Sequence, residues 1–228
     1  MKKIILILTI ALILIFASTG TAFAEAHGYC QKTQGYYYGI AATIKTSGLW
    51  LTDSDPWADF HGASIIGYND PSAGNPQPFV EFGMTRYPSR FGDQQLHKYT
   101  IQCYDGKTAI WHDLGTVNIN TYYSFAIVST GVWVSGKGYA YDCYLGAAKA
   151  DTLYLPQAKI QLKCDTNKRD AGLVNSATYF NYIKIGTAWG TNHWAAWNSS
   201  IPSVGYVLGA YKYYYYSIFD YYCAYINV

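Results

Sequence analysis

The chain has 228 residues, of which only 13% are charged, and its formal net charge at pH 7 is +2. It contains 25 tyrosines, 7 tryptophans and 9 phenylalanines, together with 21 glycines. A surface this poor in charge lacks the dense basic face that nucleic acids and anionic membranes require, so we expect neither as a partner. Aromatic residues pack well on a pleated sheet, and the composition therefore favours a β-rich protein.

The first 24 residues have the three parts of a cleaved secretory signal: two lysines, an apolar stretch over residues 4–17, and small residues up to Ala24. A retained membrane anchor is the alternative, but that stretch is shorter than the roughly 20 residues of a spanning helix. We expect cleavage before Glu25, which leaves residues 25–228 as one domain without a membrane association. A lysine-led signal of this kind indicates a secreted, extracellular bacterial or archaeal protein.

The rest of the chain alternates strand-like segments with turns. Asp105-Gly106 is the strongest hairpin signal, and a second hairpin is expected around the Ser-Gly-Lys-Gly turn at 135–138. Prolines predict loops at 53–59, 70–78 and 88–95, and residues 191–203 read as a Trp-rich loop. About ten to twelve strands at this spacing predict an all-β fold, a two-sheet antiparallel jelly-roll sandwich. The expected strand segments are 36–52, 62–69, 78–87, 97–106, 107–115, 116–131, 131–148, 153–167, 177–190 and 205–228.

Residues 61–83 form the centre of this pattern, because they contain two short strands on either side of a turn rich in Pro and Gly. We expect the two strands to be neighbours. The second strand carries Glu81, the only glutamate after Glu25. Successive side chains of a strand point to opposite faces, so Glu81 lies opposite Val80 and Phe82. If those two residues enter the core, Glu81 faces solvent or an open surface and is the candidate catalytic carboxyl.

Four segments carry a resemblance to a known family: Tyr38-Gly39, ASIIGYND, FVEFG and GVWVSG. Together they resemble the glutamic peptidases of the eqolisin group and the neprosin-like proteins, over roughly residues 36–197. The resemblance implies a secreted, concanavalin-like jelly-roll and puts Glu81 on a functional position. In the eqolisin mechanism this position is paired with a glutamate on a later strand, one group activating water and the other stabilising the oxyanion.

The chain departs from that pattern at the second catalytic strand. The segment AKIQLKCD matches it best, and Lys163 stands where the glutamate is expected. Asp165 and Asp142 are the aspartates that could substitute. Two functions therefore stay open: a non-catalytic binding or surface module related to glutamic peptidases, and an acid-acting glutamic endopeptidase-like hydrolase that uses Glu81.

Aromatic rings support the binding hypothesis. Trp189, Trp194 and Trp197 lie within nine residues, and Tyr68 follows the first strand of the central pair. Rings exposed on a concave sheet face would form platforms for an extracellular glycan or polypeptide, and we predict these four residues as ligand-binding. The alternative is that the tryptophans pack beneath loops as a satellite cluster.

Five cysteines follow the signal, which permits at most two disulfides in an exported chain. No pairing is fixed by the sequence, although a link between Cys30 and Cys223 would join the two ends of the domain. The histidines and cysteines show no metal-ligand spacing, so we expect neither a metal nor another cofactor. His61 is the histidine closest to the central strands, where a turn or surface position is the alternative to a site role. The oligomeric state is not indicated.

Overall fold

The structure, a computed structural model, describes residues 26–32, 35–46, 61–68, 77–168, 177–197, 203–208, 211–216 and 222–227. Side chains are described over 35–45, 62–68, 77–165 and 178–197. The expected signal peptide, the turn at 53–59, most of the loop at 70–78 and the side chain of His61 lie outside these ranges. In the part of the chain that is described, no helix is long and apolar enough to cross a membrane.

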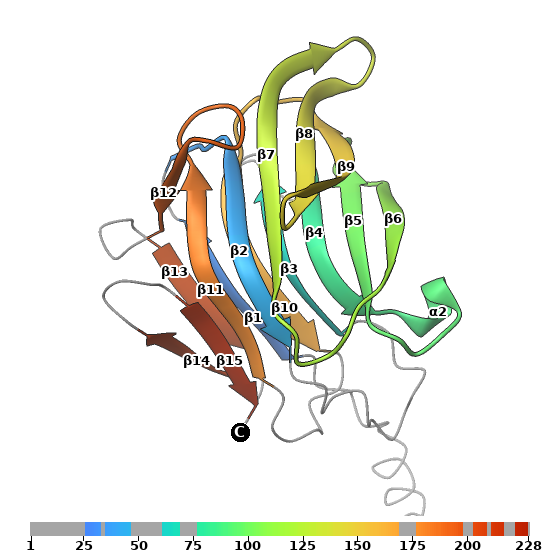
Figure 1. The fold of residues 1–228 in the computed structure, drawn as a ribbon, viewed down its shortest axis with the longest axis vertical. Coiled ribbons are helices and arrows are strands. Elements are labelled where there is room, and N and C mark those ends of the chain that lie inside the picture. Colours follow the sequence, from blue (N-terminus) through green and yellow to red (C-terminus); the bar gives the residue numbers. More distant parts are fainter. Residues whose placement is uncertain are drawn as a thin grey trace, which may run out of the picture.

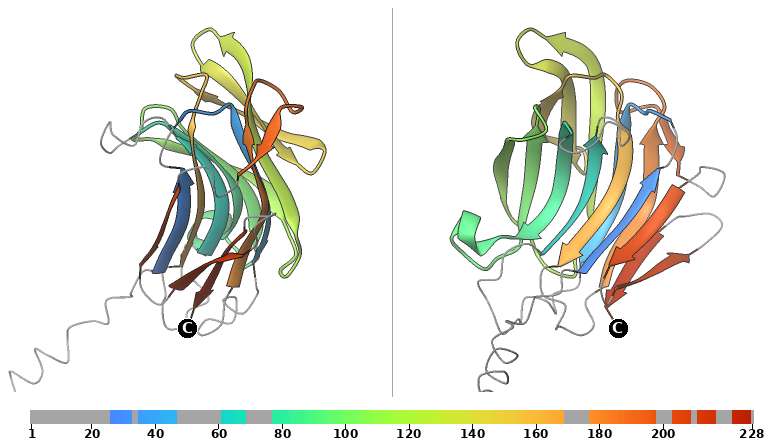
Figure 2. Two further views of the ribbon diagram at one scale, coloured as in Figure 1. Left: turned by 90° about the vertical axis from the view of Figure 1, so that its left-hand side faces the viewer. Right: turned by 180° about the vertical axis from the view of Figure 1, so that it is seen from behind.

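Two antiparallel sheets pack face to face (Figures 1 and 2), which confirms the expected all-β jelly-roll sandwich. The seven-stranded sheet has the order β13 (Ser203–Leu208), β1 (Ala26–Lys32), β10 (Gln161–Lys168), β3 (His61–Tyr68), β4 (Phe79–Arg86), β5 (His97–Cys103) and β6 (Ala109–Thr116). The eight-stranded sheet has the order β14 (Tyr211–Tyr216), β15 (Tyr222–Asn227), β11 (Ala177–Gly186), β2 (Gly39–Thr46), β7 (Tyr123–Val134), β8 (Gly138–Leu145) and β9 (Ala148–Leu155), with β12 (Trp194–Ala196) paired to β11.

The core lies between the sheets and follows the period of two that the sequence shows. Val80, Phe82 and Met84 alternate along β4 and are all fully buried. Phe82 meets Phe125 of β7 edge to face, with ring centroids 4.7 Å apart, so the rings of the two sheets interdigitate. Glu81 must therefore point away from the core, as the alternation predicts.

Polar contacts join the two sheets along one edge. Asp151 of β9 accepts a hydrogen bond from the Thr100 hydroxyl of β5, and its Oδ2 lies 2.7 Å from His112 Nδ1 of β6. Gln102 adds a third link, because its side-chain oxygen accepts the backbone N–H of Tyr154 at 2.8 Å. These contacts hold β5 and β6 against β9 and so fix the edge of the seven-stranded sheet that is closest to Glu81.

The expected hairpins are confirmed as β5 with β6 and β7 with β8. Three local expectations are corrected. Residues 88–95 contain the short helix α2 (Pro88–Phe91), which begins at a proline and ends where Gly92 adopts φ of 80° and donates to the Pro88 carbonyl. The Trp-rich loop includes β12, and the C-terminal segment contributes β13 to one sheet but β14 and β15 to the other. The described chain has fifteen strands, more than the ten to twelve expected.

Candidate functional site

Glu81 lies on the outward face of the seven-stranded sheet, which is turned toward the viewer in the right panel of Figure 2. Strand register determines its neighbours. One cross-strand row contains Lys163, Ile66, Glu81 and Ile101, and the next row contains Asp165, Ser64, Gly83 and Tyr99. Directly opposite residues share a face, so both rows project outward. The register therefore brings together polar groups from four strands, β10, β3, β4 and β5.

Gly83 explains why these groups can converge. A Cβ atom at this position would lie 2.3 Å from the Ala63 carbonyl oxygen and 2.6 Å from the Ser64 Cβ. Such distances are shorter than any ordinary contact, so only glycine fits between Ser64 and Tyr99 in the row. The missing side chain leaves space for the Tyr99 ring of β5. Its hydroxyl can therefore reach Glu81, which lies on β4 two residues before Gly83.

The Glu81 carboxyl is held by two hydroxyl groups. Tyr99 donates a hydrogen bond to Glu81 Oε1, and the Ser64 side chain also hydrogen-bonds the carboxyl. Ser64 and Tyr99 are almost completely buried, with 3% and 2% of their surface exposed. The site is thus a partly enclosed position in which a carboxyl group has donors but little water.

Burial raises the pKa of Glu81 above its usual value of 4.5. The hydrogen bonds from Tyr99 and Ser64 favour the charged form and oppose this increase, whereas the negative charge of Asp165 adds to it. Burial and the Glu81 charge also raise the pKa of Tyr99 well above 10, so its hydroxyl stays a donor at every physiological pH. The carboxyl therefore keeps its proton into less acidic solution than an exposed glutamate does.

Asp165 provides the second carboxylate on this face. It forms an ion pair with Lys163, and the two side chains are only 12% and 18% exposed. Lys163, which takes the place of the glutamate expected from the resemblance, lies in the same row as Glu81 but two strands away, a separation of roughly 10 Å. Asp142, the other aspartate considered, belongs to β8 of the opposite sheet, where Lys149 lies 2.7 Å away.

An aromatic cluster flanks the carboxyl on the side of β6. Trp111 stacks on Tyr99 with ring centroids 5.0 Å apart, and Tyr87 meets Trp111 edge to face. The Arg90 guanidinium of α2 lies 4.9 Å from the centre of the Trp111 ring. The sequence analysis missed these residues and the two hydroxyl donors. The alternation of Tyr99 and Ile101 along β5 indicates that the two side chains share a face of the sheet. It does not predict which residues of the neighbouring strands lie opposite them.

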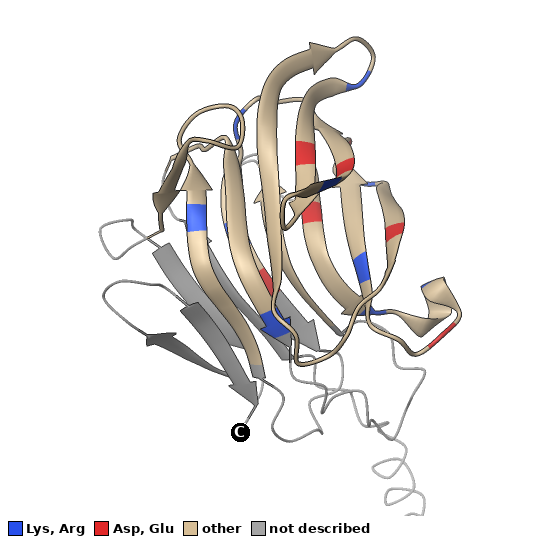
Figure 3. Ribbon diagram, viewed as in Figure 1, with Lys and Arg blue, Asp and Glu red and all other residues tan. Residues whose placement is uncertain are grey.

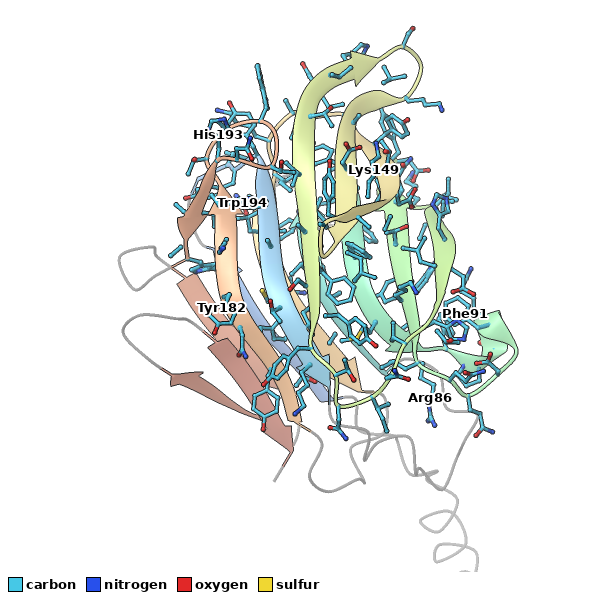
Figure 4. The ribbon with its side chains drawn as sticks, in the orientation of Figure 1. Arg86, Phe91, Lys149, Tyr182, His193 and Trp194 are labelled. Atoms are coloured by element: carbon cyan, nitrogen blue, oxygen red, sulfur yellow. The ribbon has the colours of Figure 1, made fainter. Side chains whose placement is uncertain are left out.

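The four predicted ligand-binding aromatics do not share one surface. Tyr68 lies on the Glu81 face, opposite Phe79, whereas Trp197 is 1% exposed and belongs to the core, so its ring cannot serve as a surface platform. Trp189 is exposed beside Tyr38. Trp194 lies on the outward face of the eight-stranded sheet, and Figure 4 shows it with Tyr182 on the other side of the molecule from Phe91.

Charged residues are few and scattered over the described strands, with no continuous basic face in the view of Figure 3. Within the residues that the structure describes, no group of three or more His, Cys, Asp or Glu side chains is arranged to hold a metal ion. The polar groups around Glu81 are the Ser64 and Tyr99 hydroxyls, the Asp165 carboxyl and the Lys163 ammonium.

No known protein family matches the sequence, and no curated protein matches it. Among solved structures the chain is similar to scytalido-glutamic peptidase with a peptide-based transition-state analog, at 10% identity and a TM-score of 0.48, over 89% of this chain and 98% of that one. It is also similar to Bacillus licheniformis β-glucanase, at 12% identity and a TM-score of 0.39, over 86% and 67%. A third is the κ-carrageenase from Pseudoalteromonas carrageenovora, at 9% identity and 0.30, over 90% and 80%.

These similarities concern the sandwich fold, and the likeness to an eqolisin structure agrees with the resemblance seen in the sequence. Every TM-score named is below 0.5, so none of them assigns chemistry to Glu81.

Replacing Glu81 by Gln tests the raised pKa of this carboxyl. The folded protein keeps the Glu81 proton at pH values where the unfolded chain has lost it, so wild-type stability falls as pH rises from about 4.5 through the folded pKa. Glutamine is neutral at every pH. The difference in unfolding free energy, variant minus wild type, is therefore expected to increase between pH 4 and pH 8 in urea titrations.

Asp105→Asn is the control with the opposite sign. The backbone N–H groups of Thr108 and Lys107 lower the pKa of Asp105, so its contribution is present above pH 3.8 and lost as pH falls through the folded pKa. This variant should lose stability relative to wild type as pH rises through the acid range up to about pH 5, and the difference should stay nearly constant at higher pH. A Glu81→Gln difference that is flat with pH, or that follows the Asp105→Asn direction, contradicts the assignment.

Proposed function

We propose that this protein is an acid-acting, endopeptidase-like hydrolase in which Glu81 and Asp165 are the two catalytic carboxyl groups. One observation carries the proposal: both groups project from the same sheet face on either side of Ser64, and their surroundings differ. Glu81 is desolvated, which favours the neutral acid, whereas Asp165 forms an ion pair with the Lys163 ammonium. Two carboxyls in contrasting environments are the usual basis of an acid and base assignment.

The roles follow from these environments. Asp165 accepts a proton from a water molecule as the water oxygen attacks the carbonyl carbon of the substrate. Glu81 hydrogen-bonds the carbonyl oxygen and then donates its proton to the leaving nitrogen, so that one water molecule is added across the broken bond. The Tyr99 hydroxyl, which is already bound to Glu81, holds the carboxyl in position and stabilises its anion after proton transfer.

The test is cleavage of an unfolded polypeptide from pH 2 to pH 7 by the chain, by Glu81→Gln and by Asp165→Asn. Each variant should lose activity by about 10²- to 10⁴-fold, the range for a general acid or base. Asp142→Asn is the matched control, because Asp142 is also paired with a lysine but lies in the other sheet. Cleavage by the wild type no faster than without protein, or cleavage by Glu81→Gln as fast as by the wild type, would contradict the proposal.

A second function, binding of an extracellular glycan, is supported by a groove on the outward face of the eight-stranded sheet. Its volume is about 180 Å³, and the residues that line it include Thr43, Ser124, Tyr182, Lys184 and Trp194. Tyr182 is 57% exposed and has a φ of 52° at the bulge of β11. Aromatic rings and hydroxyl groups that line the same groove suit the apolar face and polar edge of a sugar ring.

Glycan-array binding by the wild type and by Trp194→Ala and Tyr182→Ala tests this second function. We expect both variants to lose at least tenfold in affinity if a sugar ring stacks between them. Trp133→Ala is the control, because Trp133 is 54% exposed outside the groove. Binding that survives in both groove variants would exclude this surface as the binding site.

We also propose that the chain is exported and that Cys30 and Cys164 form a disulfide. The two residues are directly opposite each other in β1 and β10, and opposite residues of antiparallel strands have a Cα separation of roughly 4.5–5.5 Å, within the range of disulfides. No disulfide joins Cys103, Cys143 and Cys164 to one another. This pairing is proposed in place of a link between Cys30 and Cys223, because the register puts Cys164 directly opposite Cys30.

Non-reducing peptide mapping of the exported protein tests this pairing. The expected result is an N-terminus at Glu25 and a peptide pair joined through Cys30 and Cys164. Cys30→Ser should abolish that pair, whereas Cys223→Ser should leave it intact. A bridge between Cys30 and Cys223, or fully reduced cysteines in the exported chain, would contradict the assignment.

A further inference from the structure

His97 of β5 is held between two carboxylates next to the candidate site. Its Nε2 lies 2.9 Å from Asp93 Oδ1, and its Nδ1 lies 3.0 Å from Asp113 Oδ1. Phe91 of α2 stacks on the imidazole ring, with ring centroids 4.3 Å apart. The His97 side chain is only 6% exposed, so these contacts replace most of its contact with water.

Both contacts are favourable only when His97 is protonated. A neutral imidazole has one N–H donor, and its other nitrogen is an acceptor. That acceptor would face a carboxylate oxygen, which cannot donate a hydrogen bond. The backbone N–H of Gln95 donates to Asp93 and that of Gly115 donates to Asp113, both at 2.8 Å. The hydrogen bonds from His97 and from the Gln95 N–H lower the pKa of Asp93.

The two carboxylates come from the elements that surround Trp111. Asp93 belongs to the connection that follows α2, and Asp113 lies two residues beyond Trp111 in β6. Arg90 of α2 packs against Trp111, and Trp111 stacks on Tyr99, which donates to Glu81. Phe91, which stacks on His97, meets Tyr87 edge to face, and Tyr87 meets Trp111 in the same way. These ring contacts connect the His97 imidazolium with Trp111 and so with the candidate catalytic carboxyl.

We propose that His97, Asp93 and Asp113 form an acid clamp, which holds residues 87–96 and β6 around Glu81 in acidic solution and releases them as pH rises. His97 is a positioning residue in this proposal, since it reaches Glu81 only through Trp111 and Tyr99. Its effect on catalysis rests on the proposed hydrolase function. The clamp itself is defined by contacts that exist without substrate.

The direction of the pH effect follows from the groups that face the ring. Burial lowers the pKa of His97, but the hydrogen bonds and charges of Asp93 and Asp113 outweigh it and raise the pKa above 6.5. On the β4 side the residue opposite His97 is the uncharged Thr85, and Phe91 of α2 is also uncharged. The stabilisation is therefore complete below about pH 6.5 and is lost as pH rises through the folded pKa.

Hydrogen exchange of the backbone amides in residues 87–96 and 109–116 tests the clamp without substrate. In the wild-type chain, protection corrected for the intrinsic rate should fall by roughly severalfold between pH 5 and pH 8, because the contacts of the His97 imidazolium are lost when the ring loses its proton. In His97→Gln the protection should be low and independent of pH. His112→Gln is the matched control, since His112 also lies against an aspartate but on the opposite face of the sheet. Loss of its contact with β9 should lower the protection of β6 at every pH, but the fall between pH 5 and pH 8 should remain.

Wild-type protection that does not change with pH, or the same pH dependence in His97→Gln, would overturn the clamp. If His97→Gln fails to fold, Asp93→Asn serves instead, because loss of one carboxylate should shift the transition to lower pH. A parallel activity profile separates the two proposals. Loss of protection without any hydrolysis would contradict only the proposed function, whereas hydrolysis with an unchanged pH profile in His97→Gln would contradict the role of the clamp.

Discussion

The antiparallel register of β10, β3, β4 and β5 is the constraint on which the site depends. It places Phe82 in the core against Phe125 and, by alternation, sends Glu81 outward. It also aligns Asp165, Ser64, Gly83 and Tyr99 in one row beside Glu81. A shift of one residue in any of these pairings would move a polar group into the core. Burial of the apolar face therefore fixes the register, and the register fixes the positions of the polar side chains on the outward face.

The fold and the direction of Glu81 could be predicted from the sequence because both depend on local patterns. The period of two in β4 and the Asp105-Gly106 turn are visible within ten residues. The partners of Glu81 could not be predicted in the same way. Asp165 is 84 residues away along the chain, and its place beside Ser64 depends on a non-local strand pairing that no local pattern encodes.

The tryptophans show that residues close together in the sequence can also lie on different surfaces of the fold. Trp194 and Trp197 are three residues apart, yet the first lines an outward groove and the second is buried in the core. The short strand β12 ends at Ala196, and the backbone N–H of Trp197 then donates to the Ile183 carbonyl. This return to β11 turns the second ring inward. Composition alone could not assign the individual rings to a sheet.

Glu81 and His97 are both held in their protonated forms at this face, although one form is neutral and the other is charged. Desolvation favours the neutral form of Glu81, and a pair of carboxylates favours the charged form of His97, so acidic solution stabilises both states. The groups are connected through Tyr99 and Trp111, and neither protonated form depends on a second glutamate.

Lys163 also affects the titration of Glu81, because its ion pair with Asp165 reduces the negative charge that Glu81 experiences. A glutamate at position 163 would add a negative charge to the same row and raise the pKa of Glu81 further. The lysine and the aspartate two residues later therefore work as a unit, which supplies a carboxylate to this face while limiting its repulsion of Glu81.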